Sequence, residues 1–311
     1  MISVIIITKN RDHALQRISL PSLLRQDFLD FEIILWDASD SDKSEEVARN
    51  FEPFFAEKGI SCRFFRAPRH GSPSQRNDAA AVARGNTLFF IDDDSEVSPD
   101  GLNGLNSCFS ENPLVMGAGL RVEEVCDAGE TTTSGTDSFK KIIYRLLGYQ
   151  KKRKVFSSGS AKGITVSAGP AEWLSGCSMA FRREVFEVLS FNEKLQAFGG
   201  YAMCEDVEFS HHVFLHYGYP LQIARQGHVR HHEVSEARAP LDERRIAMIF
   251  YNRYILMRLA AQRGPLRGRI GFTWNMMRRF ISMCFRHGIV WTFKGSLLAL
   301  QKAAAERSKE Q

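Results

Sequence analysis

Short apolar runs alternate with helical patterns along the N-terminal part of the chain. The apolar runs are too short for helices and are rich in β-branched and aromatic residues; they cover residues 2–7, 31–36, 62–65, 88–91 and 114–122. Apolar side chains recur at helical spacing between them, over residues 12–26, 43–56 and 74–84, and Ser98-Pro99 predicts the start of a further helix. Near-continuous apolar strands separated by helices predict an α/β fold with a buried, mostly parallel central sheet flanked by helices.

The pattern changes after residue 122. Residues 127–138 have almost no apolar content and predict a loop, and the basic segment 139–154 has apolar residues at helical spacing. Strand and helix patterns resume, and after residue 240 the chain is helical to its end. We therefore expect a main domain over 1–235, composed of a first half (1–122), a variable insertion (123–170) and a second half (171–235), and then a helical C-terminal extension over 236–311.

Charge is unevenly distributed along the 311 residues. The chain has 41 Lys and Arg residues against 36 Asp and Glu residues, a net charge of +5, but residues 264–311 alone hold nine basic residues and two acidic ones. The remainder is near neutral, which argues against a protein that binds nucleic acid. A hydrophobic content of 44% allows a full core and excludes a disordered chain.

The two ends of the chain bear on its location. Met1 leads directly into the run ISVIII without a basic segment or a cleavage site, so we expect no signal peptide, and a cytoplasmic protein. The extension interleaves apolar residues with arginines, a pattern that suits an anionic membrane surface. It equally suits a helix that packs on the main domain with a solvated basic face. The first interpretation would place the protein peripherally on the inner face of the cytoplasmic membrane.

Three adjacent carboxylates, Asp92, Asp93 and Asp94, follow the apolar run LFFI. Such a cluster repels itself and costs stability unless a cation compensates. Ligands of open α/β sheets bind at the carboxyl ends of the strands, where carboxylates suit Mg²⁺ or Mn²⁺. The alternative is an acidic turn that caps a helix. Taken alone, the cluster favours neither interpretation.

Further polar residues should lie at the same edge of the sheet. They are Thr8, Asn10 and Arg11 after the first apolar run, Asp37 at the end of the second, and Arg76 on the helix before the carboxylate cluster. Together they offer carboxylates for a base, a ribose and a metal, and cations for a diphosphate. The chain has neither GxxxxGK[ST] nor GxGxxG, so a P-loop or dinucleotide fingerprint is not expected to hold the phosphates.

Five segments, in this order, resemble the family 2 glycosyltransferases over residues 1–235. They are SVIIITKNR, IILWDASDSD, GSPSQRNDAAAVARGNTLFFIDDDSEV, WLSGCSMAFRREVF and YAMCEDVEF. The resemblance implies the GT-A fold, a nucleotide-diphosphate sugar donor, a divalent metal and an inverting mechanism. It would make 1–122 the nucleotide-binding half and 171–235 the acceptor half of a catalytic domain.

The resemblance also implies roles on the donor side. Asp37 matches the carboxylate that binds the donor base, Thr8, Asn10 and Arg11 belong to the nucleotide pocket, and Arg76 lies near the diphosphate. Asp92 and Asp94 match the ends of the family's DxD motif. Asp94 would coordinate the metal, and Asp92 would contact the sugar or ribose, or the metal as well. Asp93 is ambiguous between these roles.

On the acceptor side, Glu205-Asp206 matches the family's ED dipeptide, whose Asp is the general base. An acceptor hydroxyl has a pKa far above 7, so its proton must leave as it attacks the anomeric carbon. The competing interpretation is a pair of acids favoured by a helix N-terminus. Trp173 either contacts the acceptor or sugar or is a core aromatic. His231 or His232 matches a histidine near the metal and diphosphate, and a packing role is equally compatible with the sequence.

These features predict a metal-dependent inverting glycosyltransferase that uses a UDP- or dTDP-linked sugar. The acceptor would be a hydroxyl of a glycan or a lipid-linked molecule, in bacterial polysaccharide or cell-envelope assembly. One alternative is a nucleotidyltransferase, which usually has a glycine-rich loop that ITKNRDHA lacks. The other is a non-catalytic module that binds sugar nucleotides, which would not need Asp206.

Overall fold

The computed structural model describes residues 1–125, 153–163, 167–199, 202–232 and 242–310. The strands are β1 (Ile2–Thr8), β2 (Phe31–Asp37), β3 (Ser61–Arg66), β4 (Thr87–Asp92), β5 (Ser95–Val97), β6 (Gly117–Val125), β7 (Lys154–Val155), β8 (Ala161–Lys162), β9 (Gly169–Ala171), β10 (Met179–Arg182) and β11 (Leu221–His232). The helices are α1 (Asp12–Ala14), the π-helical η1 (Leu15–Ser19), α2 (Leu20–Leu24), α3 (Lys43–Glu57), α4 (Ser72–Val82), α5 (Gly101–Glu111), α7 (Val185–Val188), η2 (Glu193–Gln196), α8 (Glu205–Tyr217), α9 (Glu243–Ala260), η4 (Ala261–Arg263), α10 (Pro265–His287) and α11 (Ile289–Glu310).

Nine of the described strands form one mixed sheet in the order β3-β2-β1-β4-β10-β6-β11-β5, with β9 paired to β11. The four N-terminal strands β3, β2, β1 and β4 are parallel, as expected for βαβ units. Beyond them, β10 runs antiparallel to β4 and β6, and β5 and β9 run antiparallel to β11. The predicted α/β GT-A fold class is confirmed, although antiparallel pairs make up much of the second half of the sheet.

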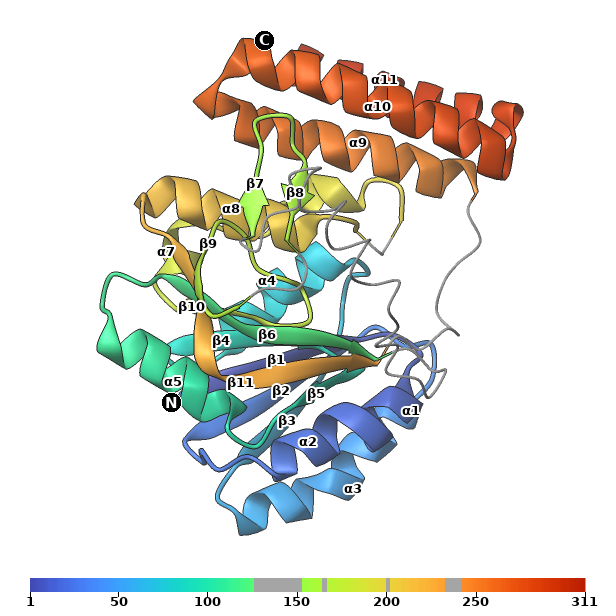
Figure 1. Cartoon of the computed structure of the whole chain (residues 1–311). Helices are drawn as coiled ribbons and strands as arrows, with labels where there is room; N and C mark the ends of the chain where they lie inside the picture. Colours follow the sequence, from blue (N-terminus) through green and yellow to red (C-terminus); the bar gives the residue numbers. More distant parts are fainter. Residues whose placement is uncertain (126–152, 164–166, 200–201, 233–241, 311) are drawn as a thin grey trace, which may run out of the picture.

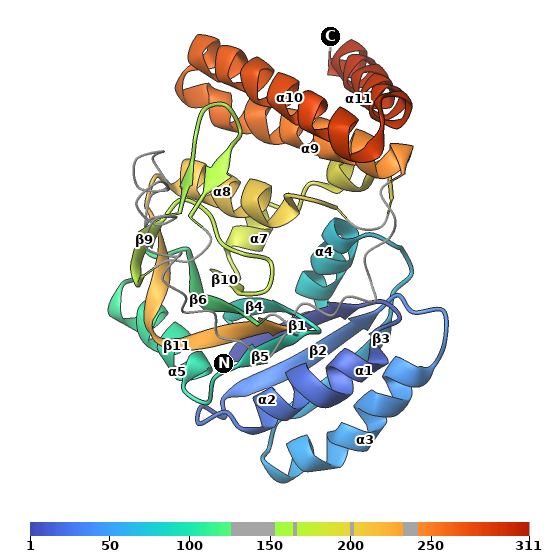
Figure 2. The ribbon, with the colours of Figure 1, turned by 45° about the vertical axis from the view of Figure 1, so that its right-hand side comes forward.

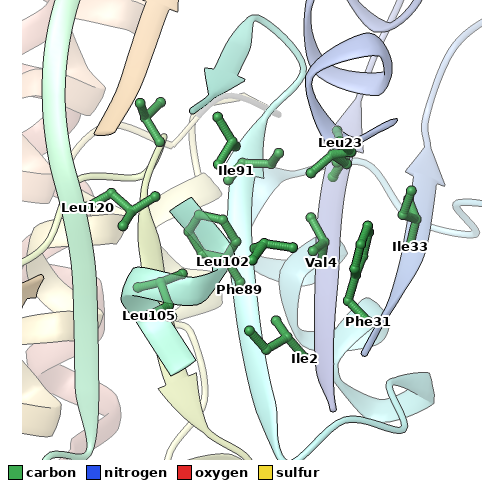
Figure 3. Close-up of a cluster of buried hydrophobic side chains, with 14 of the residues drawn as sticks. Ile2, Val4, Leu23, Phe31, Ile33, Phe89, Ile91, Leu102, Leu105 and Leu120 are labelled. Atoms are coloured by element: carbon green, nitrogen blue, oxygen red, sulfur yellow. The ribbon is translucent and has the colours of Figure 1, made fainter. Parts of the chain in front are cut away.

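Helices cover both faces of this sheet (Figure 1). The alternation of side chains along β1 shows why: Ile2, Val4 and Ile6 belong to the core on one face, and Ile5 belongs to the core on the other. Figure 3 shows the first core, where leucines of α2 and α5 pack against β1, β2 and β4. The second core lies under α4, α7 and α8. Burial on both faces leaves the carboxyl ends of the parallel strands as the polar edge of the sheet.

The C-terminal helices α9, α10 and α11 pack on one another on the side of α8 that faces away from the sheet (Figures 1 and 2). Tyr251 and Tyr254 of α9 and Ala299 and Ala303 of α11 form a core of their own with Leu195. None of the helices in the described ranges is both long and apolar enough to cross a membrane.

The start of α5 corrects one detail of the sequence interpretation. The helix begins at Gly101 after Asp100, not at Ser98-Pro99. The backbone N–H of Ser98 donates to the carbonyl of His228, and the Ser98 hydroxyl accepts from the N–H of His228, each at 2.9 Å. Because Ser98 is bound to β11, it does not cap the helix. The loop predicted over 127–138 and nearly all of the basic segment 139–154 lie outside the described residues.

Candidate active site

Three potential metal ligands meet at the carboxyl end of β4. Asp92, Asp94 and His231 each offer one ligand atom, and these atoms lie within 4.8 Å of one another. Asp92 ends β4, whereas His231 lies far along the chain, on β11. The antiparallel pairing of β5 with β11 sets His231 opposite Ser95, so that its Nε2 lies 3.3 Å from Asp94 Oδ1.

The chemistry of this cluster fits a divalent cation. Two carboxylates and an imidazole suit Mn²⁺, and the carboxylates also suit Mg²⁺. Burial raises the pKa of Asp92, and the negative charge of Asp94 raises it further, although the positive charge of Arg76 lowers it. A cation between the carboxylates would remove this repulsion. His232 instead places its Nε2 3.0 Å from Glu96 Oε2, so the cluster contains His231 and not His232.

Asp93 points to a different set of partners. Its Oδ2 accepts a hydrogen bond of 2.7 Å from Thr8 Oγ1, and its Oδ1 lies 2.8 Å from Arg11 Nη1. Arg11 also pairs with Asp94. Burial raises the pKa of Asp93 to about 7, in opposition to Arg11. Thr8 and Asp93, both buried, and the partly exposed Arg11 are therefore brought together, and they hold the loop after β1 against the Asp92–Asp94–His231 cluster.

Asp37 lies at the same edge and is fully buried. Its Oδ1 accepts from the N–H of Ser39 at 2.9 Å, and its Oδ2 lies 2.6 Å from Arg66 Nη1. Asn10 has a positive φ of 55° and donates from its N–H to Ser39 Oγ at 2.7 Å. These bonds join the loops after β1 and β2, with the Asp37 carboxylate already paired within the chain.

Arg76 connects the metal-ligand cluster to the start of α8. This buried side chain places Nη1 2.5 Å from Glu205 Oε1 and Nη2 3.3 Å from Asp92 Oδ1. Burial raises the pKa of Glu205, although Arg76 pulls in the other direction. Asp206 is more exposed than Glu205, and its Oδ2 accepts from the N–H of Gly176 at 2.9 Å. The Asp206 charge also contributes to raising the pKa of Asp92.

Residues 3–189, more than half of the chain, match the family model described as glycosyl transferase family 2. The chain belongs to glycosyl transferase family 2. One sequence relative is the uncharacterized glycosyltransferase EpsJ of Bacillus subtilis (strain 168), 32% identical over 102 residues, which are 32% of this chain and 28% of EpsJ.

Solved structures of glycosyltransferases share the fold of this family 2 member. TarS 1-349 of S. aureus, in complex with UDP-GlcNAc, has a TM-score of 0.53 and 16% identity over 83% of this chain and 65% of that one. The mannosyltransferase PcManGT from Pyrobaculum calidifontis, in complex with GDP-Man and Mn²⁺, has a TM-score of 0.56 and 14% identity over 100% of this chain and 87% of that one. The chain spans less than two thirds of the lengths of EpsJ and TarS 1-349.

Trp173 of this family 2 member lies in a small buried cluster. Only 6% of its surface is exposed, and it packs with Val207 and Leu256. The Arg153 guanidinium stacks on its ring at 4.7 Å, and its indole N–H donates to the carbonyl of Lys162 at 3.1 Å. These surroundings are those of a core aromatic side chain. A contact between Trp173 and the acceptor remains a prediction.

Sequence reasoning missed Arg66 as a partner of Asp37. A signal existed, because Arg66 ends β3 directly opposite Asp37 in the parallel register, so two opposite charges finish neighbouring strands. It also missed Arg253 and Arg279, which line a cavity between α9, α10 and the β7–β8 turn. No local pattern singles these two out among the many arginines of the C-terminal helices.

Proposed function

We propose that this glycosyltransferase moves a sugar, with inversion, from a nucleotide-diphosphate donor to an acceptor hydroxyl. UDP- and dTDP-linked sugars are the expected donors, and a glycan or a lipid-linked molecule is the expected acceptor. The observation that carries the proposal is the contact of Arg76 with both Asp92 and Glu205, because it holds the donor-side carboxylates beside the ED pair. Family membership favours a sugar-transferring enzyme over a nucleotidyltransferase or a non-catalytic binding module.

Asp206 is the residue we assign as general base. The Gly176 N–H fixes one of its oxygens at 2.9 Å, and its side chain is partly exposed, so its other oxygen can accept the proton of an acceptor hydroxyl. Glu205, tied to Arg76, is a positioning residue that holds the start of α8, where Asp206 lies.

Asp94, Asp92 and His231 are the residues that would hold Mg²⁺ or Mn²⁺. When bound, such an ion supplies positive charge for the leaving nucleoside diphosphate. The chain contributes further positive charge at this edge through Arg11 and Arg76, which bind the carboxylates and lie where a diphosphate would approach. Thr8, Asn10 and Asp37 shape the adjoining nucleotide pocket in this proposal.

The outer faces of α10 and α11 support membrane association. Leu266, Ile270, Trp274 and Phe285 form one stripe along α10, with exposed fractions of 74%, 64%, 57% and 88%. A second stripe on α11 consists of Ile289, Phe293, Leu297 and Leu300. Both helices lie on the side of the molecule remote from the sheet (Figures 1 and 2). Exposed aromatics beside arginines suit an anionic bilayer surface, so we propose peripheral attachment to the inner face of the cytoplasmic membrane.

A panel of nucleotide-diphosphate sugars tests the proposed reaction. The chain is incubated with each sugar and Mn²⁺, and release of the nucleoside diphosphate is measured without acceptor. Slow, Mn²⁺-dependent hydrolysis of one donor is expected, because water can replace the acceptor hydroxyl. Release that is absent for every donor, or equally fast after chelation with EDTA, would contradict the proposal.

A further inference from the structure

A cavity of about 520 Å³ lies between α9, α10 and the turn that joins β7 to β8. This volume is in the range of ligand pockets, about 300–1,000 Å³. Its described lining contains four arginines, Arg253, Arg278, Arg279 and Arg286, and no acidic residue. Serine hydroxyls of the β7–β8 turn complete the polar wall, and Ile249 and Met283 add an apolar part. We call this cavity the arginine pocket.

The positive charges of the arginine pocket are not neutralised by the described part of the chain. None of its four arginines pairs with a carboxylate among the described residues, and Arg253 Nε is buried without a hydrogen-bond partner. Burial and the neighbouring charge of Arg253 together lower the pKa of Arg279 to about 10. Like charges held together in this way cost stability, which an anion in the pocket would recover.

The wall of the pocket is held in a defined position. Asn275 of α10 donates from Nδ2 to Ser160 Oγ at 2.9 Å, which ties the β7–β8 turn to this helix. Gly159 has a positive φ of 70°, and a Cβ there would lie 2.7 Å from the backbone nitrogen of Met257 on α9. The turn therefore contacts both helices closely, and the arginines face a preformed space.

The pocket lies next to the segment that leads into α8, the helix that holds the residue assigned as the base. Asn252, next to Arg253 on α9, donates to the carbonyls of Leu195 and Met203 at 2.9 Å each, and Met203 lies three residues before Asp206. The charges of both the arginine pocket and the Glu205-Asp206 pair act on Cys204, the residue before Glu205. Burial raises its pKa to about 11, with Arg253 and Arg279 pulling it down and Asp206 and Glu205 pushing it up.

We propose that the arginine pocket binds a phosphate or diphosphate group carried by the acceptor, and so selects acceptors with that chemistry. Several guanidinium groups around one space match the oxygens of a phosphate better than a single carboxylate. The donor's diphosphate belongs at the end of β4, whereas the arginine pocket lies between α9, α10 and the β7–β8 turn, next to the segment that leads to Asp206. That the phosphate is carried by the acceptor rests on the proposed function, but binding of a phosphate group to the pocket can be measured independently of that function.

Isothermal titration calorimetry tests the pocket with inorganic pyrophosphate and inorganic phosphate as probes. EDTA is present throughout, so that metal-dependent binding at the donor site does not contribute. Three full-length proteins are compared: wild type, Arg253→Gln/Arg279→Gln, and the control Arg267→Gln/Arg269→Gln, which removes two exposed arginines of α10 outside the pocket. Loss of charge-assisted hydrogen bonds should weaken binding of at least one probe by about ten- to a hundredfold in the pocket variant and leave the control unchanged.

Two further measurements keep the test decisive. The pocket variant should be at least as stable as wild type in thermal unfolding without phosphate, because it loses a like-charge repulsion. Donor hydrolysis is measured separately on wild type, so a failure of the donor assay is distinguished from a failure of this inference. Pocket and control variants that bind both probes as tightly as wild type, or that lose affinity equally, would overturn the proposal.

Vesicles identify which molecule carries the phosphate. Wild type, the pocket variant and the control variant are sedimented with phosphatidylcholine vesicles that contain either phosphatidic acid, whose headgroup is a phosphate monoester, or phosphatidylglycerol, an anionic phosphodiester. The apolar stripes of α10 and α11 are intact in all three proteins, so each is expected to bind both anionic lipids. If wild type prefers phosphatidic acid and the pocket variant alone loses that preference, the phosphate is carried by a membrane lipid. If the pocket variant loses pyrophosphate binding and no protein prefers phosphatidic acid, the phosphate belongs to a soluble glycan.

Discussion

Replacing Arg76 with methionine should destabilise the protein by about 3–5 kcal/mol, the usual cost of breaking a buried ion pair. Arg76 is 3% exposed, and its two carboxylate partners come from different elements, Asp92 from β4 and Glu205 from α8. Methionine keeps much of the side-chain length but removes the charge. It leaves Glu205 buried without its cation, which accounts for most of the expected loss.

Urea unfolding at pH 7 measures this cost and its origin. The double variant Arg76→Met/Glu205→Gln removes the stranded charge and should recover part of the loss, so that the two substitutions are not additive. Arg69→Met is a matched control, because Arg69 also pairs with two carboxylates, Asp78 and Glu193, but its side chain is 46% exposed. This control should cost no more than about 1 kcal/mol. An Arg76→Met variant as stable as the control, or a double variant worse than the single one, would refute the reasoning.

Three other predictions follow from the same structure. Burial raises the pKa of Glu208 to about 7, so the folded state keeps a proton that the unfolded chain releases. The free energy of unfolding should therefore fall between about pH 4.5 and 7. In urea unfolding, Glu208→Gln should be as stable as wild type at pH 4 and more stable by about 3 kcal/mol at pH 8. Asp94→Ala should abolish Mn²⁺-dependent binding of nucleoside diphosphates in calorimetry, with a near-native far-UV circular dichroism spectrum. Wild type should pellet with anionic vesicles but not with neutral ones, and high salt should reduce this pelleting. The variant Trp274→Ser/Phe285→Ser should no longer pellet with anionic vesicles. Equal pelleting of wild type with both lipids would argue for helices that do not contact membranes.

The strands within residues 1–122 could be predicted because their apolar pattern is local. The alternation of Ile2, Val4 and Ile6 with Ile5 follows from burial on both faces of a sheet, and it needs no knowledge of distant residues. The start of α5 could not be predicted, because Ser98 bonds to His228, which is distant in sequence. Local capping preference was outweighed there by a tertiary hydrogen bond.

The candidate site, like the fold, has a part that the sequence predicts and a part that it does not. Carboxylates at strand ends can be placed at one edge from the sequence, which is why Asp37, Asp92 and Asp94 were expected together. The choice of His231 over His232 depends on the pairing of β5 with β11, and adjacent residues on a strand face opposite sides. The partners of buried charges, such as Arg66 for Asp37, depend on register and are not visible in composition or periodicity.

The transfer rate of the Asp206→Asn variant, measured with a donor and an acceptor, tests the assignment of Asp206 as the base most directly. The variant is nearly isosteric and can still accept the Gly176 N–H, so the fold and the donor site should be preserved. Without a group to take the acceptor's proton, the transfer rate should fall by about 10²–10⁴-fold, while donor affinity stays within a few-fold of wild type. Transfer at the wild-type rate, or a loss of donor affinity in place of rate, would contradict Asp206 as the base.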